Sequence, residues 1–484
     1  MFFHQRFIPG LAIYSYIVGD ERTKEAAVID PTRDVDEFIE IARREGLHIK
    51  HVLETHVHAD FVSGSREMKD RLGDGVTIHA SGLGGEEWTP PYADHVVQDG
   101  DEVTLGNVRL KAIHTPGHTL EHISWALFDD SRSTDTPWLV FTGDFTFVGD
   151  VGRPDLLGEE ARKKLAHQLY RSVFVKLPPL ADFTEIFPGH GAGSLCGKAI
   201  GSRASSTLGY ERRFNEALAE KPEEEWIADL MDQMPLSPPY FARMKRVNRE
   251  GPQVIGVELP GQRRWSAREV HERTCENCLI VDVRSKESFA AAHIPGAINI
   301  PFGPTLPTWA GWVMPYDRPT LLIVDDPTQM PEVTTHLLRV GFDDVQGYLE
   351  GGMDAWQTSG YEMATLTMMP VQTLADRRED VTVLDVRTEK EWNAGHIERA
   401  IHIHGGKLQE NFALVARDKP VVVICGSGYR GSIAASFLKR EGYEDVSNVL
   451  GGMSAWNAAG LPVETSASNG GTSCRASATV ATCA

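Results

Sequence analysis

Four short motifs in the first part of the chain carry side chains that bind metals. They are THVHADFVSG (55–64), HTPGHT (114–119), FTGDF (141–145) and FPGHG (187–191). The first contains His56, His58 and Asp60 at the spacing of metal ligands, and each of the others reaches a Gly and then a His or Asp. A strand that turns at glycine has a rigid base and a loop that aims its side chain. Although a lone histidine is more often structural, four such motifs together indicate a metal site at a sheet edge.

A fifth motif, CGSGYRG (425–431), places a cysteine directly after the apolar stretch VVVI, which is predicted to be a strand. Gly426 and Gly428 allow backbone N–H groups to turn toward the sulfur, and a helix after the loop would add its positive end. Arg430 supplies a fixed cation. Such surroundings stabilise an anionic sulfur. Because an inert core cysteine would need neither the glycines nor the arginine, Cys425 is predicted to be a nucleophile.

The bulk composition sets limits on the protein that holds these motifs. A chain of 484 residues exceeds a single core and predicts about three domains. Its formal charge of −20 opposes non-specific binding to nucleic acid or anionic lipid. No run approaches the ~20 apolar residues that cross a bilayer, and the N-terminus has no signal-peptide pattern, so a cytoplasmic protein without a membrane partner is expected. The 6 cysteines are too few and too scattered for a disulfide framework.

The second half of the chain contains an internal repeat. IVDVRSKESFAAAHIPGAINIP (280–301) resembles VLDVRTEKEWNAGHIERAIHI (383–403), and LEGGMDAW (349–356) resembles LGGMSAW (450–456). The spacing between corresponding segments of the two copies is too long for a solenoid unit, so each copy is predicted to be a whole domain. In each copy a strand ending in DVR precedes a charged helical stretch and a second strand, an alternation typical of a parallel sheet covered by helices.

The N-terminal part is organised differently. Residues 12–20 and 25–31 are predicted to be paired strands, 34–46 an amphipathic helix, and 50–56 a strand that runs into the first motif. The predicted α/β protein has five parts: a histidine-rich domain (1–215), a helical connector (216–253), the two copies of the repeat (254–360 and 367–465) and a small-residue, disordered tail (466–484).

Over residues 1 to about 215, the four metal-binding motifs resemble those of the metallo-β-lactamase superfamily, an αβ/βα sandwich with metal at one edge. Within that superfamily the chain resembles the persulfide dioxygenases, relatives of the glyoxalase II thioester hydrolases. The resemblance implies one Fe(II) per chain, held by His56, His118 and Asp144. Two imidazoles and one carboxylate form the facial triad of iron enzymes that use O₂.

The residues around this triad leave the number of metals open. By the hydrolase pattern a second metal would take Asp60, the residue at 61, His190 and a bridging Asp144, but residue 61 is Phe61, which cannot ligate. One metal is therefore favoured. The alternative is that Phe61 merely packs beneath the loop while a water fills the missing position. We assign His58, Asp60 and His190 to orienting ligands and substrate through hydrogen bonds, with partial ligation as the alternative.

The reaction that the resemblance implies is oxidation of a low-molecular-weight persulfide, such as glutathione persulfide, by O₂ to sulfite and thiol. A charged thiol needs cationic anchors, and Arg is preferred because its fork is bidentate. The candidate thiol-binding residues follow the last histidine motif: Lys198, Arg203, Tyr210, Arg212, Arg213 and Cys196. A solvated helix face is an equal alternative for each cation, and a buried small hydrophobe is the alternative for Cys196.

Residues 367–465 closely resemble a rhodanese, a domain that carries sulfane sulfur on one cysteine. The resemblance implies that Cys425 is nucleophile and persulfide carrier. The anion-binding loop would be Gly426, Ser427, Gly428 and Tyr429, with Arg430. In the first copy DDPTQM (325–330) is placed opposite CGSGYR, with Asp325 at the position of Cys425, so that copy is predicted to be an inactive rhodanese acting as spacer or interface. The CxxC of Cys275 and Cys278 lacks a second pair at zinc-finger spacing and is predicted to be structural.

The whole chain is therefore expected to be a persulfide dioxygenase fused through an inactive rhodanese to an active one, and a homo-oligomer. Its expected partners are a thiol persulfide, O₂, sulfite and thiosulfate. Sulfite could accept sulfur from Cys425, or the rhodanese could supply persulfide to the iron, and residues alone do not choose the direction. The rival hypotheses are a zinc-dependent thioester hydrolase of the glyoxalase II type with a sulfurtransferase domain, and a non-catalytic sulfur-sensing scaffold.

Overall fold

The structure is a computed structural model that describes residues 1–465 except 233, 275 and 276. The predicted tail and the cysteines Cys275, Cys474 and Cys483 lie outside the described residues. The chain divides into two compact units. The first holds residues 1–263 with 303–317 and 326–346, and the second holds residues 264–302, 318–325 and the chain from 347 onward. The predicted domain boundaries stay predictions.

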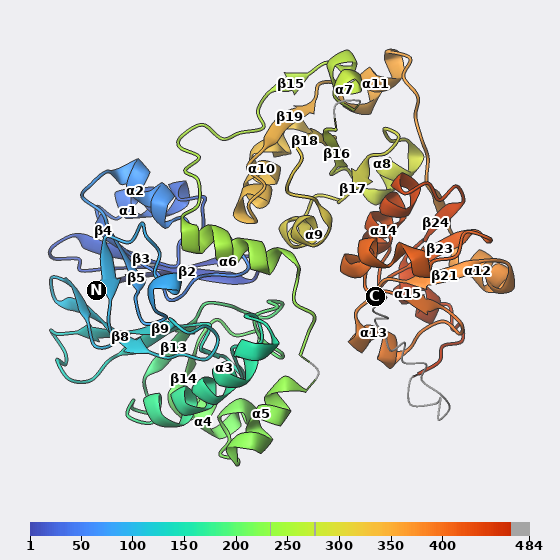
Figure 1. Cartoon of the computed structure of the whole chain (residues 1–484). Helices are drawn as coiled ribbons and strands as arrows, with labels where there is room; N and C mark the ends of the chain where they lie inside the picture. Colours follow the sequence, from blue (N-terminus) through green and yellow to red (C-terminus); the bar gives the residue numbers. More distant parts are fainter. Residues whose placement is uncertain (233, 275–276, 466–484) are drawn as a thin grey trace, which may run out of the picture. The chain divides into compact units, whose positions relative to one another are not determined.

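The N-terminal domain is built on two six-stranded sheets (Figure 1). The first sheet runs in the order β1 (Phe2–Ile8), β2 (Ile13–Gly19), β3 (Glu25–Ile29), β4 (His48–Leu53), β5 (Thr77–Ser81) and β6 (His95–Val97). The second runs in the order β14 (Ser206–Thr207), β13 (Glu185–Pro188), β10 (Leu139–Gly143), β9 (Ile123–Asp129), β8 (Val108–His114) and β7 (Glu102–Leu105). A short ribbon, β11 (Thr146–Phe147) and β12 (Asp150–Val151), follows the metal motif at 141–145.

Helices cover the outer faces of both sheets, so the predicted sandwich is confirmed. Its inner core joins Tyr16 and Leu53 of the first sheet to Trp125 and Phe141 of the second. On the outside lie α1 (Asp36–Arg44), α2 (Ser65–Leu72), α3 (Glu159–Arg171) and α4 (Leu208–Phe214). Helix α1 begins with acidic and ends with basic side chains, which suits the helix dipole. The predicted strand pair is β2 with β3, which are antiparallel.

The segment predicted to be a connector is part of the first unit. It contains α5 (Glu223–Met231) and α6 (Tyr240–Glu250). Trp226 of α5 packs against Tyr170 and Phe174 of the α3 region. The side chain of Asn248 on α6 donates to the backbone oxygens of His58 and Phe61. The segment therefore supports the first metal motif as well as joining domains.

The two repeats are small α/β domains with parallel sheets, as predicted. The first sheet is β15 (Arg264–Trp265), β19 (Val345–Leu349), β18 (Thr320–Ile323), β16 (Leu279–Asp282) and β17 (Ile298–Asn299) in spatial order. The second is β20 (Thr367–Met369), β24 (Val446–Val449), β23 (Val421–Ile424), β21 (Thr382–Asp385) and β22 (Ile401–His402). Their helices are α7 (Ala267–Thr274), α8 (Lys286–Ala291), α11 (Gly352–Thr358), α12 (Val371–Arg377), α13 (Glu389–Ala394), α14 (Tyr429–Arg440) and α15 (Gly452–Ala458).

The strand order of the second repeat places Cys425 at a characteristic position. The chain passes from β21 to β22 on one side and from β23 to β24 on the other, so the direction of winding switches between β21 and β23. Ligands of open parallel sheets bind at the carboxyl ends of strands at such a switch. Cys425 directly follows β23, whose four residues are buried. The apolar run VVVI thus sets the cysteine at the functional edge of the sheet.

The sheet register corrects one equivalence between the repeats. Ile424 and Ile323 each pair with the aspartate of a DVR motif, in β21 and β16 respectively. Cys425 therefore corresponds to Val324, not to Asp325 as predicted. The prediction was wrong because residues of the two repeats correspond when they pair with the same position of the neighbouring strand. By that criterion Asp325 and Asp326 lie one and two positions after the residue that corresponds to Cys425. Val324 is neither nucleophile nor acid, so the absence of a reactive residue at this position still holds.

Two helices from the first repeat, α9 (Leu306–Val313) and α10 (Met330–Arg339), belong to the first unit. Arg339 forms an ion pair with Asp34 at 2.6 Å, and its carbonyl accepts the N–H of Val62. Thr308 donates to the carbonyl of Gly10. These two helices therefore pack against the N-terminal domain, and the role of the first repeat as spacer or interface stays a prediction. Among the described residues no helix is long and apolar enough to cross a bilayer, and the cytoplasmic location stays a prediction.

Candidate functional site

Three buried side chains meet at the edge of the N-terminal sandwich. His56 follows β4, His118 lies between β8 and β9, and Asp144 follows β10. Their ligand atoms all lie within 4.8 Å of one another. Oδ2 of Asp144 is 3.8 Å from Nε2 of His56 and 3.5 Å from Nε2 of His118. None of these three atoms has a hydrogen-bond partner among the described residues. Buried polar atoms without partners are costly, so the donor set fits a bound cation.

The ring of His56 is held in the tautomer that a metal requires. Oγ1 of Thr55 donates its proton to Oδ2 of Asp30, at 2.8 Å. It can therefore only accept from Nδ1 of His56, which lies 2.9 Å away. The proton sits on Nδ1 and the lone pair of Nε2 faces the donor group. A hydrogen bond from the distal ring nitrogen orients metal-binding histidines in this way.

The other two donors are oriented by groups that the motifs did not reveal. Nδ1 of His118 donates to the carbonyl of Arg153, at 2.9 Å. The backbone N–H of Asp144 donates to Nε2 of His122, at 3.0 Å, so Nδ1 of His122 carries a proton for Oγ1 of Thr115. His122 is a further histidine four residues after His118, and Thr115 belongs to the HTPGHT motif, whereas the sequence offered no signal for Arg153.

Gly189 allows the last motif to approach the aspartate. A Cβ at this position would lie 2.7 Å from Oδ1 of Asp144, closer than real Cβ atoms come. Its neighbour His190 lies with Nε2 3.3 Å from the same oxygen. Gly189 is therefore required by close approach, whereas the sequence pattern predicted only a turn at this position.

A second donor group adjoins the first. Asp60, His190 and Cys196 also have ligand atoms within 4.8 Å of one another, and both carboxylate oxygens of Asp60 lack hydrogen-bond partners. Nε2 of His190 is 3.5 Å from Asp60. Burial, together with the carboxylates of Asp144 and Asp60, raises the pKa of the Cys196 thiol to about 12. Asp60, His190 and Cys196 are thus placed as one group.

Phe61 does not take part in either group. Its ring is fully buried and packs against His58, with ring centroids 4.3 Å apart. His58 in turn points away from the first donor group, since its Nε2 lies 3.1 Å from Asp30 and 3.2 Å from Glu54. Burial would lower the pKa of His58, but the carboxylates of Asp30 and Glu54 raise it to about 10. His58 is therefore positively charged and holds the motif in place through its ion pairs with Asp30 and Glu54.

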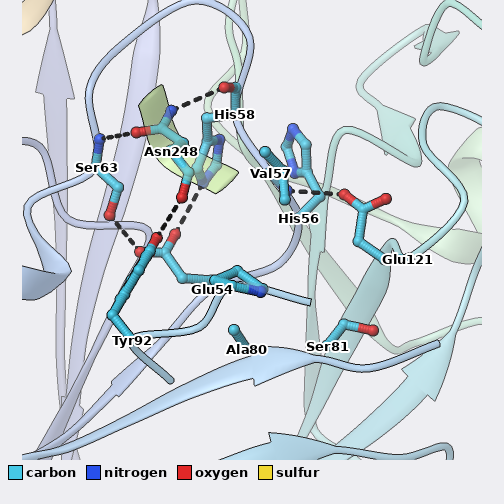
Figure 2. A pocket seen from close by; sticks show the side chains of 11 residues that line it. Glu54, His56, Val57, His58, Ser63, Ala80, Ser81, Tyr92, Glu121 and Asn248 are labelled. Carbon is cyan, nitrogen blue, oxygen red and sulfur yellow. Dashed lines mark hydrogen bonds and ion pairs between the residues drawn. The ribbon is translucent and has the colours of Figure 1, made fainter. Parts of the chain in front are cut away.

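A narrow pocket opens beside His58 (Figure 2). Ser63 and Ser65 donate to Glu54, and the backbone N–H of Val57 donates to Oε1 of Glu121 at 2.9 Å. The side chain of Asn248 lies over the loop that carries His58 (Figure 2). One wall of the pocket is therefore formed by residues of the first metal motif that are held in place by hydrogen bonds.

The predicted thiol anchors are scattered over the surface of the first unit. Arg212 donates to Asp182 and to the carbonyls of Leu177 and Leu180, so its donors are occupied by the protein. Lys198 donates to the carbonyl of Asp229. The remaining three are exposed or lie on the surface of α4: Arg203, Tyr210 and Arg213. A thiol-binding role stays a prediction for all of them.

The second candidate site surrounds Cys425. The Sγ atom accepts the backbone N–H groups of Gly428, at 3.1 Å, and Gly431, at 3.2 Å. Gly428 caps the start of α14 and has φ +92°, a backbone conformation that favours glycine. The loop thus turns donors toward the sulfur as predicted. Cys278 of the CxxC is buried and donates to the carbonyl of Pro319.

Arg430 makes a contact that the motif did not predict. Both of its terminal nitrogens donate to the carboxylate of Glu391, at 2.7 and 2.6 Å. Burial opposes ionisation of Glu391, but the hydrogen bonds from Arg430 lower its pKa to about 2. Glu391 is fixed by a capping box with Thr388 at the start of α13. The positive charge of Arg430 is therefore balanced by the carboxylate of Glu391.

Two family models match the chain. Residues 8–190 match the metallo-beta-lactamase superfamily, and residues 266–359 and 370–459 each match the rhodanese-like domain. A solved structure of a metallo-beta-lactamase from Staphylococcus aureus shares 37% sequence identity, with a TM-score of 0.64, and the match covers 72% of this chain and 98% of that one. The chain belongs to the metallo-beta-lactamase superfamily and carries two rhodanese-like domains.

Relatives of two activities are similar to the N-terminal part. The mitochondrial persulfide dioxygenase ETHE1 of Bos taurus is 30% identical over 236 residues, which are 49% of this chain and 82% of that protein. The cytoplasmic hydroxyacylglutathione hydrolase of Arabidopsis thaliana is 34% identical over 178 residues, which are 37% of this chain. The chain spans 63% of the length of that hydrolase. The superfamily membership is therefore plain, while the choice between oxidation and hydrolysis rests on the site.

Proposed function

We propose that this chain is a non-haem iron persulfide dioxygenase coupled to a rhodanese. The observation that carries the proposal is the buried group of two imidazoles and one carboxylate, His56, His118 and Asp144, whose ligand atoms lack partners. This donor set is typical of Fe(II) enzymes that use O₂. The similarity to a persulfide dioxygenase and the attached rhodanese-like domains support sulfur as the substrate element.

The proposed reaction converts one persulfide, one O₂ and one water into one thiol, one sulfite and two protons. Fe(II) held by the three donors would supply the redox chemistry between sulfur and O₂. The chain's own residues orient that group: Thr55 fixes the ring of His56, Arg153 fixes that of His118, and His122 holds the backbone of Asp144. Because all six are buried, the site keeps bulk water away from the reacting sulfur.

Sulfur transfer is assigned to Cys425. Its thiolate would attack the outer sulfur of thiosulfate, forming an S–S bond while the bond to the SO₃ group breaks and its electron pair leaves with sulfite. In the opposite direction sulfite attacks the outer sulfur of the Cys425 persulfide, and thiosulfate forms. The N–H groups of Gly428 and Gly431 stabilise the anionic sulfur in both directions.

A zinc-dependent thioester hydrolase is the second candidate. The donor group of Asp60, His190 and Cys196 favours it, because Cys196 offers a ligand where Phe61 does not, and two-metal hydrolases of this fold use such a neighbouring site. The sulfur context of the rhodanese-like domains favours the dioxygenase instead.

The test compares both reactions on the full chain, loaded without oxygen with Fe(II) or with Zn(II). One bound iron and O₂ uptake with glutathione persulfide, with sulfite formed, support the proposal. Two bound zinc ions with cleavage of a glutathione thioester, and no O₂ uptake, would sink it. His118→Ala should reduce O₂ uptake to background, whereas His167→Ala, on the surface of α3, serves as the control. Cys425→Ser should abolish sulfur transfer and leave O₂ uptake intact.

A further inference from the structure

The first rhodanese-like domain, which lacks a cysteine at the position of Cys425, contacts the helix that follows the Cys425 loop. The backbone N–H of Asn299 in β17 donates to Oγ of Ser436, at 3.0 Å, and Oγ of Ser432 donates to Oδ1 of Asn299, at 2.6 Å. These three side chains are buried. The hydroxyl of Tyr429 donates to the carbonyl of Pro301. Helix α14, and with it the end of the loop, is therefore held against the first repeat.

The loop itself provides little net positive charge for an anionic substrate. Arg430 is neutralised by Glu391, to which both of its terminal nitrogens donate. Two backbone N–H groups face Sγ of Cys425. Thiosulfate carries two negative charges, so a further cation beside the loop would strengthen its binding.

Lys286 from the first repeat lies against that loop. If residue 428 had a Cβ, the atom would lie 3.3 Å from Cε and 3.7 Å from Cδ of Lys286. The same residue, Gly428, donates its N–H to Sγ of Cys425. Nζ of Lys286 pairs with Glu287 at 2.7 Å, but the Glu287 carboxylate is 60% exposed. An exposed ion pair contributes little, so the ammonium group can exchange that partner for a substrate anion at small cost.

We propose that Lys286 is an anion-binding residue of the Cys425 site, supplied by the first repeat, which has no cysteine at the position of Cys425. The inference rests on the proposed sulfurtransferase activity. Alignment of DVRSK with DVRTE places Glu389 at the equivalent position of the second repeat, so that repeat has no lysine at its own corresponding position. The first repeat thereby contributes to substrate binding as well as to the interface.

The experiment measures sulfur transfer by the full chain from thiosulfate to cyanide. Lys286→Met should raise the KM for thiosulfate about tenfold, the size expected from one lost hydrogen bond to a charged group, while kcat stays within twofold. Lys286→Arg should keep KM near the original value because the charge remains. Lys419→Met is the matched control, since this exposed lysine precedes β23 at the end away from Cys425. A singly charged aryl thiosulfonate donor should show a smaller change in KM than thiosulfate.

Two results would overturn the inference while leaving the proposed activity intact. One is a KM for Lys286→Met within twofold of the original. The other is an equal rise in KM for Lys286→Met and Lys286→Arg, which would mean that charge is not the cause. If the unaltered chain transfers no sulfur from thiosulfate at all, the proposed sulfurtransferase activity itself fails.

Discussion

Asn248 offers the most direct test of how the metal motif is held in place. This α6 residue donates to the carbonyls of His58, at 2.8 Å, and Phe61, at 2.7 Å, and its Oδ1 accepts the N–H of Ser63, at 2.8 Å. The side chain is 2% exposed. Replacement by leucine keeps the branched shape and the number of heavy atoms but removes every polar atom of the side chain. Two carbonyls and one N–H of the loop would then be buried without partners.

The size of the effect follows from those three groups. Leaving a buried donor or acceptor unpaired costs about 1–3 kcal/mol each, so Asn248→Leu should destabilise the loop by at least about 3 kcal/mol. Local opening would then become roughly 100-fold more frequent. Because His56 and Asp60 lie in the same segment, metal affinity should fall with it.

Hydrogen exchange followed by mass spectrometry measures that opening directly, because it reports the free energy of local unfolding. In Asn248→Leu, peptides that cover residues 56–65 should exchange roughly 100-fold faster, and peptides from the second rhodanese-like domain should not change. Arg246→Ala, an exposed change on the same helix, is the control. If exchange over 56–65 stays within threefold of the original, α6 does not hold the loop and our reasoning is wrong.

Two further predictions concern charge and ligand orientation. Burial opposes ionisation of Asp34, but Arg339 and Arg6 hold its pKa well below the ordinary value. Its stabilising contribution is therefore full at neutral pH and is lost as the pH falls below about 4. Asp34→Asn should lower stability by about 3 kcal/mol at pH 7. The difference in Tm between the variant and the original protein should become smaller at acidic pH. A difference in Tm that is constant with pH would contradict the assignment. His122→Phe removes the acceptor for the Asp144 N–H and should weaken metal binding about tenfold in chelator competition. An unchanged metal affinity would mean that His122 does not orient the ligand.

The repeats show how far local patterns carry a prediction. The apolar run before Cys425 and the glycines after it predicted a strand that ends in a loop of N–H donors, and the two bonds to Sγ are there. These features depend only on neighbouring residues. Arg430 illustrates the limit, because its partner Glu391 lies 39 residues earlier and meets it through the packing of α13.

The same limit explains the one wrong equivalence. Val324 and Asp325 both follow an apolar strand, and local pattern does not decide which of them corresponds to Cys425. The paired residues of neighbouring strands decide it, since a register is a relation between segments distant in the chain. The role of Asn248 was hidden for the same reason, since its partners lie more than 180 residues away.

The sequence by itself determined the kinds of donor and their local setting: histidines and aspartates after glycine turns, a cysteine in a glycine loop, and a repeat without a cysteine in the corresponding loop. Backbone sterics and side-chain chemistry are properties of short segments. Only the tertiary structure decided which donors share a site, that Cys196 lies beside Asp60 and His190, and that Lys286 reaches the loop of another domain. Such neighbours are set by the packing of buried surfaces, to which every part of a domain contributes at once.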